Sequence, residues 1–290
     1  MTSVSITPVS PIASIRSADW KVVAPWLAAG LAFLVLFGEP MRTLATDWWQ
    51  MPEAQHGLLL FPLALYLGWR AGLEPAEPRV GLGVVVLAGA VLLRYVAGVA
   101  EELFTMRASI LVAAAGIVIY ARGIGQLKRW WLPIALLALS IPLPAVVLGG
   151  LALPLQLKAS QLGAWLLGWR HVPVRLAGNI LYLPTRALFV TEACSGLRSL
   201  TALVAIGVLA GGLWLKTPLA RLLLAGLAIP IALLLNSVRI FVAGFFVYYV
   251  DPGLADGIMH YTEGWVIFLV AFVLLAGAAW GLTRVEARIP

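Results

Sequence analysis

The sequence predicts an all-α, polytopic membrane protein with about eight transmembrane helices, because three observations agree. Hydrophobic residues make up 62% of the 290 residues and charged residues only 11%, whereas about a quarter of the residues of a soluble domain are charged. Apolar runs of roughly 20 residues, long enough to cross a bilayer, recur along the chain. Lys and Arg, which give a net charge of +7, lie mainly in short segments between these runs. That distribution sets orientation in a membrane and does not indicate a nucleic-acid partner.

The first five predicted spans alternate with loops of different charge, as the preference of basic residues for the cytoplasmic side requires. These spans cover about 22–38, 57–69, 80–97, 103–121 and 130–149. The segments expected in the cytoplasm contain Arg16, Lys21, Arg70, Arg79, Arg122, Lys128 and Arg129. Glu101 and Glu102, in contrast, form an acidic loop on the outer side. Arg94 and Arg107, which lie inside spans, are expected to pair with these glutamates.

The N-terminal residues 1–20 are rich in Ser, Thr and Pro, and we expect them to form a disordered cytoplasmic tail. Residues 21–285 then form a single multi-pass membrane domain. No small-residue cleavage site follows the first apolar run, so we interpret that run as a retained span and not as a signal peptide.

Residues 150–191 break the alternation of spans and loops. In their first part, polar residues such as Gln156 and Lys158 stand among leucines, a pattern typical of an amphipathic helix in the membrane interface. The second part, 172–191, mixes β-branched residues with Pro and Gly and predicts an extended, hairpin-like segment outside the bilayer. This short outer segment leads directly to Cys194.

The last three predicted spans cover about 196–215, 219–238 and 261–282. They bring both termini to the cytoplasmic side, and they place Cys194, Arg239 and His260 together at the outer face, where His56 also falls. The piece 240–250 is too short to cross, so it lies in the interface or extends the preceding helix. Two GxxxG patterns, which favour close helix packing, occur at Gly207/Gly211 and Gly277/Gly281.

Polar side chains are densest at the start of the sixth predicted span. The stretch 192–199 contains Glu192, Cys194, Ser195, Gly196, Arg198 and Ser199. Polar groups at membrane depth are costly, so such a cluster indicates a functional site. Cys194 is the single cysteine of the chain, which excludes an intramolecular disulfide and a cysteine-based zinc site. The three histidines are too scattered to indicate a metal site, and we expect no cofactor.

Cys194, Arg239 and His260 together suit acyl transfer through a thioester. A helix N-terminus and the nearby Arg198 both lower the pKa of the Cys194 thiol, which attacks only as the thiolate. His260 also opens a helix, which favours the neutral imidazole that a general base requires. Arg239 has hydrogen-bond donors only and can stabilise the oxyanion of a tetrahedral intermediate. Alternatively, the thiolate forms without His260, which then acts chiefly as the acid that protonates the leaving amine.

Each member of this trio also has a purely structural interpretation. A lone cysteine in a membrane helix often serves as a small packing residue. An arginine near a helix end often extends to the lipid headgroups, and a histidine at the interface contacts headgroups or starts a helix. Residue spacing alone does not decide between these interpretations and catalysis.

Three segments resemble the exosortase/archaeosortase family of multi-pass membrane proteins. They are Glu192-Ala-Cys194-Ser-Gly-Leu-Arg198-Ser, Asn236-Ser-Val-Arg239-Ile, and His260 followed by Gly264-Trp265. Trp48-Trp49 and His56-Gly57 also resemble an early loop of the family, although Gln55 stands where the family commonly has serine. The resemblance covers roughly residues 20–285.

The resemblance implies a membrane-embedded cysteine protease or transpeptidase with a thioester intermediate. It implies Cys194, Arg239 and His260 as catalytic residues and Glu192, Ser195, Gly196, Arg198, Asn236 and His56 in supporting roles. It further implies substrates that are exported proteins with a C-terminal sorting signal, which consists of a short motif such as Pro-Glu-Pro, a transmembrane helix and a basic cluster. Processing would occur at the outer (periplasmic) face of the cell inner membrane, among its lipids. The substrate, the acceptor after thioester formation and the oligomeric state stay open.

Two other functional classes are compatible with the sequence. A transporter or flippase would explain the polytopic scaffold, but the chain shows no internal repeat of the kind that transporters often carry. A non-catalytic scaffold of an export assembly would leave Cys194 as a packing residue. Within the enzymes, an acyltransferase acting on lipid or glycan can use the same trio. Cys194→Ala separates the classes, because it inactivates an enzyme and spares a transporter or scaffold.

Overall fold

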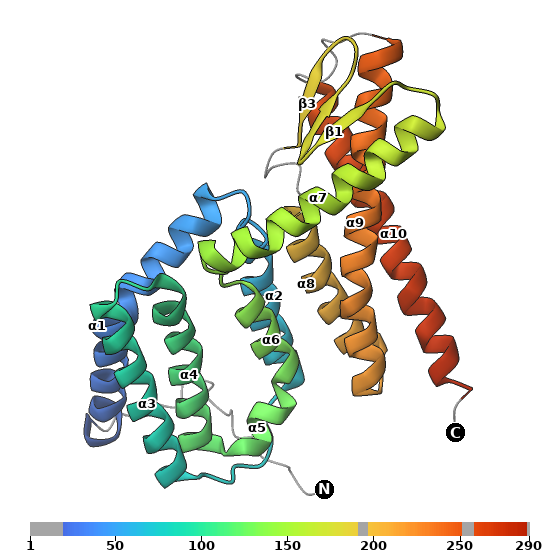
Figure 1. The fold of residues 1–290 in the computed structure, drawn as a ribbon. Helices are drawn as coiled ribbons and strands as arrows, with labels where there is room; N and C mark the ends of the chain where they lie inside the picture. Colours follow the sequence, from blue (N-terminus) through green and yellow to red (C-terminus); the bar gives the residue numbers. More distant parts are fainter. Residues whose placement is uncertain (1–19, 191–196, 251–257, 289–290) are drawn as a thin grey trace, which may run out of the picture.

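The computed structural model describes residues 20–190, 197–250 and 258–288, which form ten helices and three short strands (Figure 1). The helices are α1 (Trp20–Gln50), α2 (Gly57–Ala71), α3 (Val80–Val99), α4 (Leu103–Arg122), α5 (Ile124–Arg129), α6 (Trp131–Leu139), α7 (Ala145–Trp169), α8 (Leu197–Trp214), α9 (Pro218–Tyr249) and α10 (Ile258–Glu286). The strands are β1 (Arg175–Ala177), β2 (Ile180–Tyr182) and β3 (Ala187–Phe189). Residues 1–19 of the predicted N-terminal tail lie outside the described residues.

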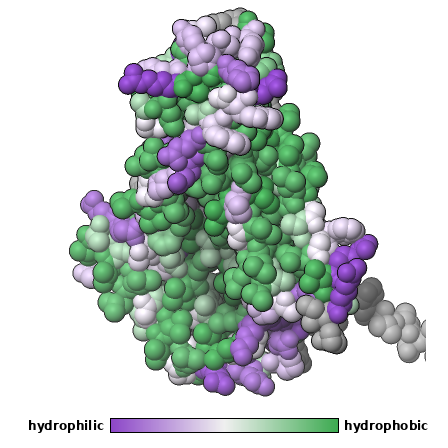
Figure 2. All heavy atoms as spheres, turned by 45° about the vertical axis from the view of Figure 1, so that its right-hand side comes forward, coloured by the Kyte–Doolittle hydropathy of each residue, from purple (hydrophilic) through white to green (hydrophobic). Residues whose placement is uncertain are grey.

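The described chain is mostly helical, as predicted, and much of its surface is apolar. Figure 2 shows hydrophobic residues covering the middle of the molecule, with hydrophilic residues gathered mainly toward its upper and lower ends. Five helical segments are long and apolar enough to cross a membrane, namely Leu27–Gln50, α3, α4, α9 and Val266–Glu286. Gly57–Ala71 and Ser199–Trp214 are shorter apolar helices. The protein is therefore a multi-pass membrane protein, but length and composition identify five candidate spans in the described residues and not the eight predicted.

The apolar run 130–149, predicted as one span, is divided between two helices. α6 ends at Leu139, and α7 begins at Ala145. Pro142 and Pro144 lie between them, and proline lacks the N–H donor of a helix and disfavours helical backbone in the residue before it. α7 then runs obliquely across α8 and α9 (Figure 1). The prediction of a continuous fifth span over 130–149 is therefore wrong.

Two ion pairs attach α1 to the hairpin formed by α3 and α4. Nη2 of Arg94 lies 2.9 Å from Oε2 of Glu39, and Nη2 of Arg107 lies 2.7 Å from Oδ2 of Asp47. The prediction that these arginines pair with the two glutamates of the α3–α4 loop is therefore wrong. Their partners come from a helix that is more than 50 residues away in the sequence, which proximity along the chain could not reveal.

Glu102, one of those two glutamates, caps the N-terminus of α4. Its carboxylate accepts hydrogen bonds from the backbone N–H groups of Phe104, at 3.0 Å, and Thr105, at 2.7 Å. A carboxylate at this position satisfies N–H groups that have no partner inside the helix. The hydrogen bonds, chiefly those of Thr105, hold the pKa of the Glu102 carboxyl below its usual value.

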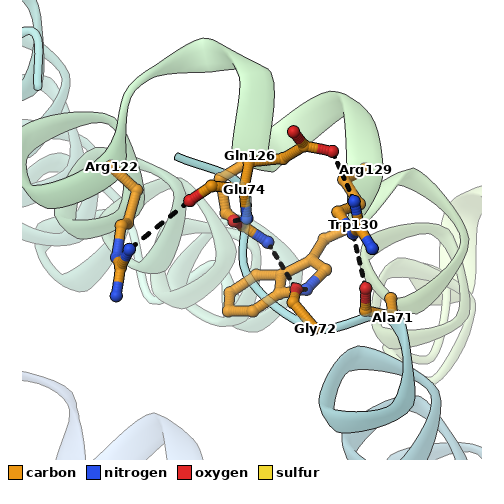
Figure 3. Close-up of polar contacts among 7 residues, drawn as sticks. All are labelled: Ala71, Gly72, Glu74, Arg122, Gln126, Arg129 and Trp130. Atoms are coloured by element: carbon orange, nitrogen blue, oxygen red, sulfur yellow. Dashed lines mark hydrogen bonds and ion pairs between the residues drawn. The ribbon is translucent and has the colours of Figure 1, made fainter. Parts of the chain in front are cut away.

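On the side predicted to be cytoplasmic, a polar network fastens the segment after α2 to α5 (Figure 3). The fully buried Gln126 accepts the N–H of Glu74 at 2.8 Å and donates to the carbonyl of Gly72 at 3.1 Å. The indole of Trp130 donates to the same carbonyl, and Arg129 pairs with the carboxylate of Glu74. Because the buried amide is hydrogen-bonded through both its oxygen and its nitrogen, the α2–α3 connection is held firmly against α5.

α8 and α9 pack as a close antiparallel pair. A Cβ atom added at Gly207 would lie only 3.1 Å from the Cα atom of Ala225, and one added at Gly211 would lie 3.4 Å from that of Arg221. The first GxxxG pattern therefore brings two backbones together, as predicted.

The second GxxxG pattern, Gly277 and Gly281 on α10, does not pack closely. A Cβ atom added at either glycine meets no atom within 4 Å among the described residues, so this prediction is wrong. α10 is instead fastened at its last turn, where the carboxylate of Glu286 accepts the backbone N–H groups of Lys216 and Thr217 at 2.9 and 2.8 Å. These groups precede α9, so both helices are joined at this end.

The opposite end of the molecule is built on the last turns of α9. α9 has 32 residues, about 48 Å at 1.5 Å per residue, which exceeds a hydrocarbon core of about 30 Å. The segment 240–250 thus extends the preceding helix, one of the two predicted alternatives. β1, β2 and β3 form an antiparallel sheet in which Leu181 pairs with Leu176 and Leu188. This sheet confirms the predicted extended segment, and it packs on Leu167 of α7 and Ile240 of α9.

α7 joins this sheet to the membrane helices. α7 confirms a helix in this region, but not the predicted amphipathic pattern, because Gln156 and Ser160 are buried whereas Leu153 and Trp165 are exposed. The buried face approaches α9 closely.

Candidate active site

Two of the predicted site residues, Asn236 and Arg239, line a cavity of about 50 Å³ where α8, α9 and α10 meet. The other lining residues are Ser199 and Leu203 of α8, Ala232 and Leu235 of α9, and Ile267, Phe268 and Ala271 of α10. Along each helix these positions are one, three or four residues apart, so each helix contributes one face. The cavity is therefore enclosed by one face of each of the last three helices.

The cavity has a polar end and an apolar end. Ser199 lies nearer the N-terminus of α8 than Leu203, and Asn236 and Arg239 lie nearer the C-terminus of α9 than Ala232. Because α8 and α9 are antiparallel, Asn236 and Arg239 lie at the end of the cavity toward the start of α8, whereas the register of the two helices puts Ser199 beside Ala232. Asn236 is only 4% exposed, and Arg239 is half-buried. Charges and dipoles in such surroundings act more strongly on a bound group than they do in water.

Arg239 lies about one helical turn beyond the height at which α8 begins. The contact of Gly207 with Ala225, and that of Gly211 with the preceding turn of α9, set the antiparallel register of the two helices. Continued along both helices, this register puts Leu235 level with Leu197, the first residue of α8, and Arg239 one turn further along α9. The arginine thus stands at the end of the bundle where the chain enters α8.

Two described helices begin close in the sequence to the other predicted residues of the trio. α8 begins at Leu197, three residues after Cys194, and α10 begins at Ile258, two residues before His260. Glu192, Cys194, Ser195 and Gly196 lie outside the described residues, and so do the side chains of Arg198 and His260.

His56 belongs to a different cluster, at the end of α6. Its Nε2 atom lies 3.0 Å from the carbonyl oxygen of Leu139, and the indole N–H of Trp48 donates to the carbonyl of Ser140 at 2.7 Å. Gly57 is required beside them, because a Cβ atom there would lie 2.1 Å from the indole nitrogen of Trp48. These residues fasten the α1–α2 connection to α6, where the last helical carbonyls need donors. In the described part of the chain, His56 does not line the cavity.

The apolar walls of the cavity were not predicted from the sequence. Ser199 stood in the polar stretch without an assigned role, and Ala232 and Ala271 carry no functional group. The available signal was a row of small residues on α9, Ala228 and Ala232, whereas Ala271 on α10 stands among larger residues. Such a row is equally typical of ordinary helix packing, so it does not identify a cavity by itself.

Comparison with known proteins adds one finding. A family model described as transmembrane exosortase matches residues 48–277, a range that contains every predicted site residue from His56 to His260. No curated protein and no solved structure matches the chain.

Proposed function

Because this chain belongs to the transmembrane exosortase family, we propose that it is a cysteine protease or transpeptidase that cleaves C-terminal sorting signals of exported proteins. One observation carries the proposal: Asn236 and Arg239 line a cavity at the end of the bundle where α8 and α10 begin. Cys194 precedes α8, and His260 lies in the first turn of α10. This arrangement supports a common site for the three residues.

In the proposed reaction, the thiolate Sγ of Cys194 attacks the carbonyl carbon of the bond to be cleaved. The carbonyl electrons move to oxygen, and the guanidinium of Arg239 donates hydrogen bonds to this oxyanion. The C–N bond then breaks, His260 gives a proton to the leaving amine, and a thioester remains on Cys194. Water or an amine then attacks the thioester and gives a proton to His260, which restores its protonation, and the thiolate is released.

The proposed substrate is a protein anchored by a C-terminal transmembrane helix that carries a short motif before the helix and a basic cluster after it. A helix lying in the bilayer beside α8, α9 and α10 would present the segment before it at the height of Arg239. Lipid-facing surface is available, because α10 exposes Val266, Val273 and Trp280.

We further propose that the active site faces the periplasm and that both termini lie in the cytoplasm. α1 begins and α10 ends at the same end of the molecule (Figure 1). The basic residues Arg122, at the end of α4, and Arg129, in α5, belong to the network of Figure 3, and α5 lies at this end in Figure 1. Basic residues are retained preferentially on the cytoplasmic side of the inner membrane. The opposite end, with the cavity mouth and the sheet, would then lie outside.

The test is processing of a tagged substrate with such a C-terminal signal, co-expressed with the full chain and followed by its size. Cys194→Ala and His260→Ala should abolish processing, and Arg239→Ala should slow it about 100- to 1,000-fold, the usual cost of one oxyanion donor. Arg175→Ala and His171→Ala, at exposed positions near the sheet, are matched controls that should process normally. Normal processing by Cys194→Ala, with the protein present in the membrane, would refute the nucleophile assignment and favour a transporter or scaffold.

A further inference from the structure

We propose that the cavity between α8, α9 and α10 is a subsite for one small aliphatic side chain of the substrate, next to the bond that is cleaved, and that Ala232 and Ala271 set its size. The proposal rests on the proposed function, since it names the substrate group that this site accepts. The two are tested by different measurements: the subsite by the relative processing rates of different substrates, and the proposed function by whether cleavage occurs at all.

The lining of the cavity favours an apolar occupant at its deep end. Leu203 is fully buried there, and Ala232 and Ala271 are only 6% and 2% exposed. Arg239 is the one charged residue among the described lining residues, and it stands with Asn236 at the opposite end. A peptide bond held at the polar end can therefore place a neighbouring apolar side chain against the deep walls, where it loses contact with water.

The volume of the cavity selects a small side chain. At about 50 Å³, it exceeds the roughly 10–15 Å³ that one water molecule needs. It is much smaller than the cavity of about 150 Å³ that accepts benzene in a protein core. A methyl or isopropyl group therefore fits, whereas an aromatic ring does not.

Ordered water explains the deep end less well than a side chain does. A buried water molecule typically needs two to four polar partners, and Ser199 is the one polar side chain that the described lining places beside Ala232, since Asn236 and Arg239 lie further toward the start of α8. A lipid chain would need a longer path than the lining provides, since it extends about 10 Å along α9, from Ala232 to Arg239.

Two pairs of alanines provide matched variants. Ala232 and Ala271 line the cavity, whereas Ala228 on α9 and Ala279 on α10 lie in the same apolar cluster without lining it. Both control alanines are 0% exposed, so the added methyl groups of Ala→Val are at least as difficult to accommodate there as at the cavity. Ala232→Val and Ala271→Val add methyl groups at the cavity, and Ala228→Val and Ala279→Val add them elsewhere.

The experiment measures processing rates of substrates in which each residue flanking the cleaved bond is changed in turn to Gly, Ala, Val, Phe or Glu. The cleaved bond is located by mass spectrometry of the product. At one flanking position, the unchanged protein should process Ala and Val at least about tenfold faster than Phe, since one methylene in an apolar pocket changes specificity about 10- to 200-fold. Ala232→Val and Ala271→Val should shift the preference from Val to Gly by about tenfold, and the two control variants should keep the original preference.

Several results would overturn the proposal. A flat side-chain profile at both positions, or a preference for Phe or Glu, shows that this cavity does not select a small aliphatic group. Equal slowing of all substrates by the two cavity variants shows that water or lipid occupies it. In these cases processing that still requires Cys194 leaves the proposed function intact. Absence of any Cys194-dependent processing overturns both.

Discussion

Removing the charge of Asp47 should destabilise the protein strongly, whereas removing that of Glu39 should not. Both carboxylates bind an arginine of the α3–α4 hairpin, at 2.7 and 2.9 Å. The two pairs differ in burial: the side chains of Arg107 and Asp47 are 4% and 23% exposed, and those of Arg94 and Glu39 are 16% and 52% exposed. The pairs therefore form a matched comparison within one interface.

The burial of Arg107 determines the expected magnitude. At an effective dielectric constant of 20, two charges 2.7 Å apart attract by about 6 kcal/mol before the cost of desolvation. The Nε atom of Arg107 is buried and has no hydrogen-bond partner among the described residues. Asp47 therefore provides most of the interaction energy that offsets the desolvation of the Arg107 guanidinium. Breaking a buried pair on one side typically costs about 3–5 kcal/mol, and the partial exposure of Asp47 favours the lower end. For the more exposed pair, about 0–1 kcal/mol is expected.

The assay is unfolding of the purified protein in mixed micelles, followed through the fluorescence of its 12 tryptophans. Asp47→Asn should lower the free energy of unfolding by about 3 kcal/mol and Glu39→Gln by less than about 1 kcal/mol. Adding Arg107→Met to Asp47→Asn should recover part of the loss, because it removes the unpaired charge. An equal or larger loss for Glu39→Gln would refute the reasoning from burial.

Three further outcomes are expected. His56→Ala should lower thermal stability while leaving the processing rate per folded molecule within about twofold, and a selective loss of rate in a normally stable variant would contradict its assignment to the α6 contact. Gly207→Ala should destabilise the α8–α9 pair, because its Cβ atom would lie 3.1 Å from the backbone of Ala225. Gly277→Ala, on the open face of α10, should instead stabilise that helix by up to about 1 kcal/mol. Thermal unfolding of both variants tests these two predictions. Glu102→Ala should lower the free energy of unfolding by about 0.5–2 kcal/mol, because it removes the cap of α4. Since folding lowers the pKa of the Glu102 carboxyl, its stabilising contribution is present above the ordinary value of about 4.5 and is lost as the pH falls below it. Unfolding measured between neutral and acidic pH would detect this loss.

The long apolar segments were predictable because burial in lipid demands them. The predicted spans 57–69, 80–97 and 103–121 agree with α2, α3 and α4 to within two residues at each end. The extended segment before Cys194 was predictable for a related reason, since its β-branched residues and prolines exclude a helix. In each case a local property of the chain determines the local structure.

The contacts between distant segments were not predictable in this way. Arg107 was paired with a neighbouring glutamate because the sequence gives no measure of the position of Asp47 in space. The run 130–149 was interpreted as one span by its length, although Pro142 and Pro144 interrupt it. The walls of the cavity depend on how three helices are rotated against one another, and Ala232 and Ala271 differ in no chemical way from their packed neighbours.

α9 acts as a ruler. Its first turn is fixed by the Thr217 side chain, which accepts the N–H of Ala220, and by Glu286 from α10. From Thr217 to Arg239 the helix rises about 33 Å, close to the thickness of the hydrocarbon core. The helix continues past Pro230, which lies within this stretch, so its length sets how far Arg239 lies from the opposite end of the bundle. If the proposed substrate is anchored by a transmembrane helix, an anchor one turn too long or too short would shift its cleavage point by about 5 Å relative to the guanidinium.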